Sequence, residues 1–413
     1  MTSLRRRTVL SGAAGTLLAA RSNSLRAQSS NTIRIGITFP LSGSQALVGQ
    51  PQLLGAQIAR DQINARGGVL GKQIELVVLD DHADPSQAVA NIHELAGKGA
   101  NLVVGPSLGS SALAVLPSLA HDRMVVMGPS VIDERFSHEF FNRNYFGIVE
   151  PSYIRHVAYS KVMAARFPDI TTWTAIIFEQ AVGHDNWAIA SKALPYWYEK
   201  IAKKKVTMID PLFCAIGTTD FKNQISQIIA SPAQGLLTVL SGADGVTFYQ
   251  QMLAFGLEKK IKAFADVAID INLGKALKNK VPTNAWIASF WYYDAAKNKE
   301  SQALAAEYTK RTGELPHAFA GPAHIGINLY ASAIQKTGGT DTEQIISALE
   351  GIHLDSVKGA GFVRKEDHQF IADSYLFTLK PKDGPPGFQT NETVTVSVAG
   401  DIYPPAPGTV WKY

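Results

Sequence analysis

The feature that most constrains the fold of this chain is a regular alternation of short apolar runs with amphipathic stretches, which starts near residue 33. The first series predicts strands at 33–39, 74–79, 102–104 and 124–127, separated by helices at 51–66, 85–97 and about 111–120. Parallel neighbours need a long crossover between them, and a helix is its usual form. The pattern therefore indicates an α/β fold whose parallel sheet is covered by helices on both faces.

The alternation restarts near residue 150. The second series predicts helices at 152–167, 187–203, 221–229 and 245–255, with strands at 173–178, 206–213, 235–240 and near 263. A strand at 285–290, helices at 301–312, 322–336 and 340–349, and a strand-rich tail from 361 follow. A chain of 413 residues is too long for one core. We therefore expect two lobes of similar size, linked by more than one crossover.

The charge of the chain is unevenly distributed. The net charge is +4, but five arginines and no acidic residue lie within the first 27 residues, so the remainder carries −1. A nearly neutral protein has no electrostatic reason to bind nucleic acid or an anionic membrane. Later apolar runs are short and interrupted, so we expect no stable membrane insertion of the mature chain.

The first 27 residues are typical of an export signal. Arg6 and Arg7 precede Thr8-Val9-Leu10 and a weakly apolar stretch at 11–20, which resembles a twin-arginine signal; a general secretory signal with an extra arginine is the alternative. No cysteine follows this stretch closely, and the single cysteine is Cys214. We therefore expect a protein that is exported to the periplasm, is not lipid-anchored, and has no intramolecular disulfide.

Three loops after predicted strands are candidates for ligand binding, because ligands of open α/β sheets bind outside the carboxyl ends of the strands. They are the segments 40–50, 105–111, which includes Gly109, and 128–132. Ser110 and Ser111 lie where a helix is expected to begin, and free backbone N–H groups there suit a carboxylate. The alternative is that these serines only cap their own helix.

One motif is also compatible with an enzyme. Gly105-Pro106-Ser107-Leu108-Gly109 matches the G-x-S-x-G nucleophile elbow of hydrolases, in a strand–turn–helix setting. No oxyanion segment of the usual glycine-rich type precedes it, so a secreted serine hydrolase remains the lesser alternative. The Asp80-Asp81-His82-Ala83-Asp84 run fits no standard zinc spacing. We expect no cofactor and no metal.

Segments in a fixed order along the chain carry a family resemblance. They are IGITFPLSG at 35–43, DQINARGGVLGK at 61–72, DDHADP at 80–85, VVGP at 103–106, TDF at 219–221, QMLAFGL at 251–257 and YASAI at 330–334. Together they resemble the branched-chain amino acid (Leu/Ile/Val-binding) family of type I periplasmic solute-binding proteins, which serve ABC transporters.

The resemblance implies the architecture and the activity. It implies two doubly wound, Rossmann-like lobes joined by three crossovers: an N-terminal lobe of 31–148 plus 289–352 and a C-terminal lobe of 149–288 plus 353–413. Such a monomer would close over a small solute without catalysis and deliver it to the permease subunits of an ABC importer. A ligand-binding sensory receptor component would use the same lobes, so it remains an alternative.

The resemblance also implies where the ligand lies. The expected ligand-binding residues are Val48, Gly109, Ser110, Ser111, Ser130, Ile132, Val182, Ala243, Asp266 and Phe319. Amino-acid binders of the family have a hydroxyl residue where this chain has Ile132, and aromatic residues where it has Val48 and Val182. A polar ligand group without its partner costs about 1–3 kcal/mol. We therefore expect a small carboxylate-, amide- or amino-acid-like solute, such as an aromatic acid, other than leucine or isoleucine.

Overall fold

The computed structural model describes residues 31–398, so the predicted export signal at 1–27 lies outside the described residues. The first sheet consists of β1 (Thr32–Phe39), β2 (Gln73–Asp80), β3 (Leu102–Val104), β4 (Val125–Gly128) and β5 (Tyr145–Gly147). Its strands run parallel in the order β2-β1-β3-β4-β5. Strand β1 pairs with both β2 and β3, which places the carboxyl ends of these strands, and the loops that follow them, at one edge.

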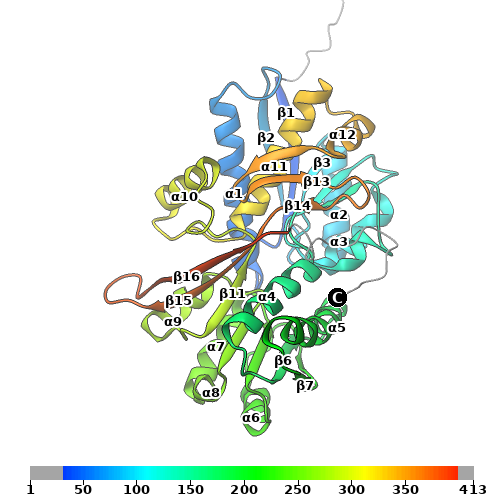
Figure 1. Ribbon diagram of the computed structural model, residues 1–413. Helices are drawn as coiled ribbons and strands as arrows, with labels where there is room; N and C mark the ends of the chain where they lie inside the picture. The colour runs from blue at the N-terminus through cyan, green and yellow to red at the C-terminus, as the bar shows by residue number, and fades with distance from the viewer. Residues whose placement is uncertain (1–30, 399–413) are drawn as a thin grey trace, which may run out of the picture. The chain divides into compact units, whose positions relative to one another are not determined.

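Both faces of this sheet are buried. On β3, Leu102 and Val104 pack into one apolar cluster and Val103 packs into another, because successive side chains of a strand point to opposite faces. The helices that follow these strands are α1 (Ala46–Ala65), α2 (Pro85–Gly97) and α3 (Gly109–Val115). Helices α10 (Lys299–Thr312), α11 (Ala320–Thr337) and α12 (Thr342–Leu349) come from much later in the chain, and α11 packs beside α1 (Figure 1).

Helix α1 begins five residues before the predicted start and contains Pro51. Proline favours the first turn of a helix, which is why the sequence favoured a start at 51. The earlier start depends on packing: a Cβ on Gly49 would lie 2.1 Å from the carbonyl oxygen of Pro40. The first turn of α1 therefore lies directly against the end of β1, and Val48 is buried there.

The second sheet is mixed. It contains β6 (Thr172–Phe178), β7 (Thr207–Met208), β8 (Leu212–Cys214), β9 (Gly235–Val239), β10 (Ala263–Asp266), β11 (Ala285–Ser289), β15 (Ser374–Pro381) and β16 (Phe388–Val396). Strands β6 to β11 pair in parallel, whereas β15 pairs antiparallel with β11 and β16 pairs antiparallel with β15. The last two strands form the long hairpin drawn in red-brown in Figure 1.

Helices cover the second sheet as well. They are α4 (Ser152–Arg166), α5 (Ala181–Trp197), α6 (Lys222–Ala230), α7 (Gly242–Ala254), α8 (Leu257–Lys260) and α9 (Asn272–Leu277). Helix α5 starts six residues before its predicted start, and a Cβ on Gly183 would lie 2.1 Å from the carbonyl oxygen of Phe178. The glycine lets the helix begin directly after β6, so Val182 lies in the first turn of α5 rather than in a loop.

A small antiparallel sheet of β12 (His353–Ser356), β13 (Gly359–Val363) and β14 (Phe370–Ile371) completes the described chain. The predicted α/β class with parallel sheets is confirmed. The exact lobe boundaries stay a prediction, although β11 at 285–289 belongs to the second sheet. Among residues 31–398, no helix is both long and apolar enough to cross a membrane.

Candidate functional site

A cavity of about 130 Å³ lies where loops from the carboxyl ends of both sheets meet. The loops after β1, β3 and β4 line it from the first sheet, and the loops after β6, β8, β9 and β10 line it from the second. This is the position at which open α/β sheets bind their ligands. Its lining residues are Gln45, Val48, Ser107, Leu108, Gly109, Ser130, Val131, Ile132, Asp133, Arg155, Phe178, Gln180, Val182, Asn186, Ile216, Val239, Ser241, Val267, Ala268, Phe290 and Phe319.

The walls of the cavity are mainly apolar. Phe178 ends β6, Phe290 follows β11, and Phe319 precedes α11. The rings of Phe290 and Phe319 lie 5.4 Å apart between centroids, and Val48 packs in the same small cluster. Such walls favour a solute with an apolar part, because its burial removes apolar surface from water.

The serines on the first-sheet side are held by Gln52, which is fully buried. The hydroxyl of Ser107 donates to Gln52 Oε1, Gln52 Nε2 donates to Ser130 Oγ at 2.9 Å, and Ser130 Oγ donates to the carbonyl of Ser107 at 2.8 Å. A serine nucleophile needs a base that accepts its proton. The partner of Ser107 is an amide oxygen, which cannot serve as one.

On the second-sheet side, the amide of Asn186 is fixed by two contacts. Its Oδ1 lies 2.7 Å from Nε2 of His156, and its Nδ2 donates to the carbonyl of Val182 at 2.6 Å. Burial lowers the pKa of His156 to about 4, so the imidazole is neutral at pH 7. Because an amide oxygen only accepts, we assign the imidazole proton to Nε2.

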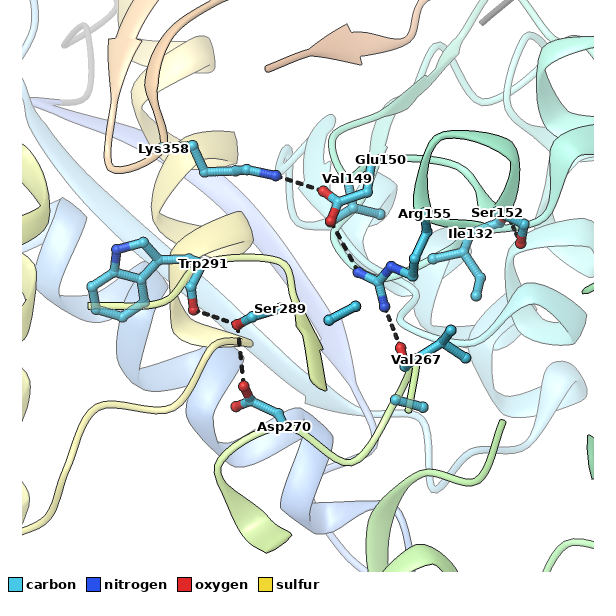
Figure 2. A network of polar contacts seen from close by, with 12 residues as sticks. Ile132, Val149, Glu150, Ser152, Arg155, Val267, Asp270, Ser289, Trp291 and Lys358 are labelled. Atoms are coloured by element: carbon cyan, nitrogen blue, oxygen red, sulfur yellow. Dashed lines mark hydrogen bonds and ion pairs between the residues drawn. The ribbon is translucent and has the colours of Figure 1, made fainter. Parts of the chain in front are cut away.

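Arg155 is a buried cation in the wall of the cavity. Its side chain is only 2% exposed, although it belongs to the second turn of α4. One terminal guanidinium nitrogen donates to the carbonyl of Val267, and the other donates to Glu150 at 3.2 Å (Figure 2). The guanidinium also lies 4.0 Å from the ring centroid of Phe290. Within the described part of the chain, Nε of Arg155 has no hydrogen-bond partner.

Glu150 joins Arg155 to a second buried cation. Its other carboxylate oxygen lies 2.5 Å from Nζ of Lys358 (Figure 2). Burial by itself would raise the pKa of Glu150, but Lys358 and Arg155 outweigh it and keep the pKa below its usual range. The carboxylate is therefore ionised at neutral pH, and the group of three carries two positive charges and one negative charge.

The cavity wall also contains one carboxylate, Asp133, and its charge is compensated. Arg135 donates to Asp133 Oδ1 through Nε at 3.0 Å and to Oδ2 through Nη2 at 2.6 Å. This two-pronged contact is the strongest geometry for an arginine–carboxylate pair. Nε of Arg135 also lies 3.2 Å from Asp185 in α5, which links a loop of the first sheet to a helix of the second.

Comparison with known proteins identifies the family. A model of the periplasmic binding proteins matches residues 32–385. The chain belongs to the periplasmic binding protein family. Members of this family bind solutes for ABC transporters without catalysis, so this periplasmic binding protein is a solute-binding protein and not an enzyme. The serine hydrolase considered from the sequence is therefore not supported.

Individual relatives agree with this assignment. The protein is 26% identical over 357 residues to a leucine-, isoleucine-, valine-, threonine- and alanine-binding protein of Pseudomonas aeruginosa, which covers 82% of this chain and 87% of that relative. Two solved structures show the same fold. A solute-binding protein from Rhodopseudomonas palustris BisB5 in complex with 3,4-dihydroxybenzoic acid has a TM-score of 0.77 at 18% identity and covers 89% of this chain and 97% of its own.

The second structure is a branched-chain amino acid transporter substrate-binding protein from Streptococcus pneumoniae in complex with isoleucine. Its TM-score is 0.73 at 20% identity, and the match covers 88% of this chain and 99% of that one. The predicted type I fold and the predicted family are confirmed for this periplasmic binding protein.

Six of the ten sequence-predicted site residues line the cavity of this periplasmic binding protein: Val48, Gly109, Ser130, Ile132, Val182 and Phe319. The other four are not among its lining residues. Ser110 and Ala243 are exposed, whereas Ser111 is buried, and its hydroxyl has no partner among the described residues. Whether any of the ten contacts a ligand stays a prediction.

The remaining residue of the ten, Asp266, is fully buried behind the cavity wall. Its carboxylate accepts from the hydroxyls of Thr238 and Tyr249 and from the backbone N–H groups of Ala268 and Ile269. These four donors fix the turn after β10. Asp266 thereby positions Val267 and Ala268, which do line the cavity.

Sequence reasoning missed the polar residues Arg155 and Asn186, and it included Gln45 only as part of the candidate loop 40–50 without singling it out. Arg155 lies in a helix that the sequence predicted correctly, and an arginine in an amphipathic helix is usually solvent-exposed. The sequence did contain a signal: Arg155 lies five residues after the acidic residue Glu150 and directly after the apolar Ile154. Gln45 and Asn186 carry no local signal that separates them from other amide residues.

Proposed function

We propose that this periplasmic binding protein binds a small organic carboxylate in the cavity and delivers it to the permease of an ABC importer. One observation carries the proposal: the guanidinium of Arg155 is buried in the cavity wall with an unsatisfied N–H. A buried charged donor without a partner is costly. A carboxylate in the cavity would supply that partner through a charge-assisted hydrogen bond.

The charge around Arg155 supports an anion over a neutral or cationic solute. Glu150 neutralises only one of the two cations that contact it, Arg155 and Lys358. Arg135 is shared between Asp133 and Asp185, so it leaves no excess positive charge beside Asp133. The excess positive charge therefore lies on the side of Arg155, and a ligand carboxylate would balance it in a region that water screens poorly.

The relatives bind solutes that share this group. Isoleucine and 3,4-dihydroxybenzoic acid, the ligands in the two solved structures, differ in shape and in the rest of their polar groups, yet both carry a carboxylate. The aromatic walls of Phe178, Phe290 and Phe319 are compatible with a flat apolar body. Amino acids and aromatic acids are therefore the first solutes to test.

The mechanism we propose is ligand-stabilised closure. The cavity receives Val48 and Ser130 from the first sheet, and Arg155 and Val267 from α4 and from the loop of the second sheet. A ligand that contacts both sides binds the closed form more tightly than the open form, and so shifts the population toward closure. The export signal predicted at 1–27 supports a periplasmic location, where the closed form would meet the permease.

The test is a thermal-shift screen followed by calorimetry, with each acid paired with its own amide, for example benzoate with benzamide. The acid is expected to stabilise the protein and the amide is not. Replacing Arg155 by methionine should weaken binding of the acid by about 10- to 100-fold, since a hydrogen bond to a charged group contributes about 1.5–3 kcal/mol.

Lys358→Met is the matched control, because it removes the other cation of Glu150 without touching the cavity lining. Both variants leave Glu150 with one cation, so both report any damage that follows from breaking the ion network. Equal losses of affinity in the two variants, or an amide that binds as well as its acid, would contradict the proposal.

A further inference from the structure

Gln45 is the second polar group of the cavity that lacks a partner. It lies in the loop after β1, immediately before α1, and is 2% exposed. Its backbone carbonyl accepts from Val48 at 2.9 Å, so the main chain here is held in the first turn of the helix. Gln45 is one of the residues that line the cavity. Neither Oε1 nor Nε2 has a hydrogen-bond partner in residues 31–398.

The neighbour of this amide on the side of the second sheet is a glycine. A Cβ built on Gly242 would lie 3.4 Å from Nε2 and 3.5 Å from Oε1 of Gln45. The amide therefore lies against a residue without a side chain, at the start of α7 on the second sheet. Because Gly242 has a φ of +61°, a region that favours glycine, a residue with a Cβ would be strained there.

The other buried amides and hydroxyls of the wall are occupied. Ser107 and Ser130 are held by Gln52, and Asn186 is held by His156 and Val182. Gln180 is exposed and Ser241 is partly exposed, so water can reach them. Burial of a polar group without a partner is rare in folded proteins. Gln45 and Arg155 are thus the two groups whose hydrogen bonds the described chain leaves open to a bound solute.

We infer that Gln45 recognises a neutral hydrogen-bonding group of the ligand, at a different point from the carboxylate held by Arg155. This inference rests on the proposed function and narrows its ligand to a carboxylate that also carries a hydroxyl or a carboxamide on an apolar body. The chemistry follows from the glutamine amide, which offers both a donor and an acceptor. A hydroxyl or a carboxamide also offers both, and so pairs with Oε1 and Nε2 together.

Other second groups fit Gln45 less well. An ammonium would satisfy Oε1 only and leave Nε2 without an acceptor, and a second carboxylate would satisfy Nε2 only and leave Oε1 without a donor. Sites that hydrogen-bond a substrate hydroxyl discriminate strongly against the analogue that lacks it, because the site's own polar groups then stay unpaired. Gln45 is therefore a specificity-determining residue.

The experiment compares matched carboxylates that differ only in the second group. The probes are benzoate with 3- and 4-hydroxybenzoate, and hexanoate with 6-hydroxyhexanoate and adipamate, the monoamide of adipic acid, each titrated by calorimetry into the full mature protein. At least one hydroxyl or amide probe is expected to bind about 10-fold more tightly than its parent. Gln45→Met keeps the length of the side chain and removes its polar atoms, so it should abolish this preference: the parent acid and the substituted acid should bind the variant with similar affinities.

Gln50→Met is the matched control, since Gln50 is an exposed glutamine of α1, five residues after Gln45, and its Nε2 donates to the carbonyl of Leu41 at 2.7 Å. It should retain the preference. If the parent acids bind but no substituted acid binds more tightly, or if Gln45→Met keeps the preference, the role of Gln45 is wrong while the carboxylate site stands. If none of the acids binds, the proposed function itself fails.

Discussion

Oε2 of Glu150 lies 2.5 Å from Nζ of Lys358, although 208 positions of sequence separate the two residues. Glu150 follows β5 of the first sheet and precedes α4, and Lys358 lies in the turn between β12 and β13. Both side chains are almost fully buried, at 1% and 4% exposure. The pair therefore ties two distant segments together, and it does so beside Arg155 in the cavity wall (Figure 2).

Replacing Glu150 by glutamine should lower the free energy of unfolding by about 3–5 kcal/mol, because it leaves Lys358 and Arg155 as buried, uncompensated charges. Urea unfolding followed by circular dichroism measures the change. Glu75→Gln is the control: its pair with Arg34 is half exposed on both sides, so its loss should cost less than about 1 kcal/mol. Similar losses in the two variants would show that the buried group does not act as an ion network.

Replacing Glu134 by glutamine should change how stability depends on pH. Burial raises the pKa of Glu134 to about 8, whereas the ordinary pKa of a glutamate, which applies in the unfolded chain, is 4.5. Between these values the folded state holds a proton that the unfolded state has lost, so the stability of the wild type falls as pH rises. The variant lacks this loss. Its stability relative to the wild type should therefore rise by about 1.4 kcal/mol per pH unit from pH 5 to 8; parallel curves would contradict this.

His324→Gln should have the opposite dependence. Burial lowers the pKa of His324 to about 4 from 6.5, and its Nε2 lies 2.9 Å from Gln62 Oε1. As pH falls from 6.5 to 4, His324 is protonated in the unfolded chain but stays neutral in the folded protein, so the wild type loses stability. Thermal unfolding at several pH values should show the variant gaining on the wild type toward acidic pH. An unchanged difference between pH 7 and pH 5 would show that His324 is not buried as a neutral group.

Gly49→Ala should destabilise the protein and weaken ligand binding together. The added Cβ would lie 2.1 Å from the carbonyl oxygen of Pro40, and the required shift of the first turn of α1 would move Val48 and Gln45 in the cavity wall. A cost of about 1–3 kcal/mol is typical of such overpacking. Gly97→Ala, at the exposed end of α2, meets no atom within 4 Å and should leave both melting temperature and affinity unchanged. If Gly49→Ala changed neither the melting temperature nor the affinity, the loop between β1 and α1 would be able to shift without cost.

The sequence determined the elements and their order, because the periodicity of apolar residues is a local property. It predicted most strands and helices, the parallel sheets and the family, and it placed Ser130 and Phe319 near the cavity. It failed at two helix starts. The early starts of α1 and α5 depend on the close approach of Gly49 to Pro40 and of Gly183 to Phe178. The periodicity of apolar residues does not predict such contacts.

Only the tertiary structure decided which polar groups of the cavity wall lack a hydrogen-bond partner. In the sequence, Arg155 cannot be distinguished from a surface arginine of a helix. Its burial depends on the nearby Glu150 and on two residues from distant segments, Val267 and, through Glu150, Lys358. The unpaired amide of Gln45 is visible only in the folded chain, where Gly242, almost 200 residues later in the sequence, lies next to it and has no side chain to pair with it. Whether a polar atom is satisfied depends on every segment that packs around it. The recognition chemistry of the cavity is therefore a property of the folded chain, whereas the fold that builds it could be predicted from the sequence pattern.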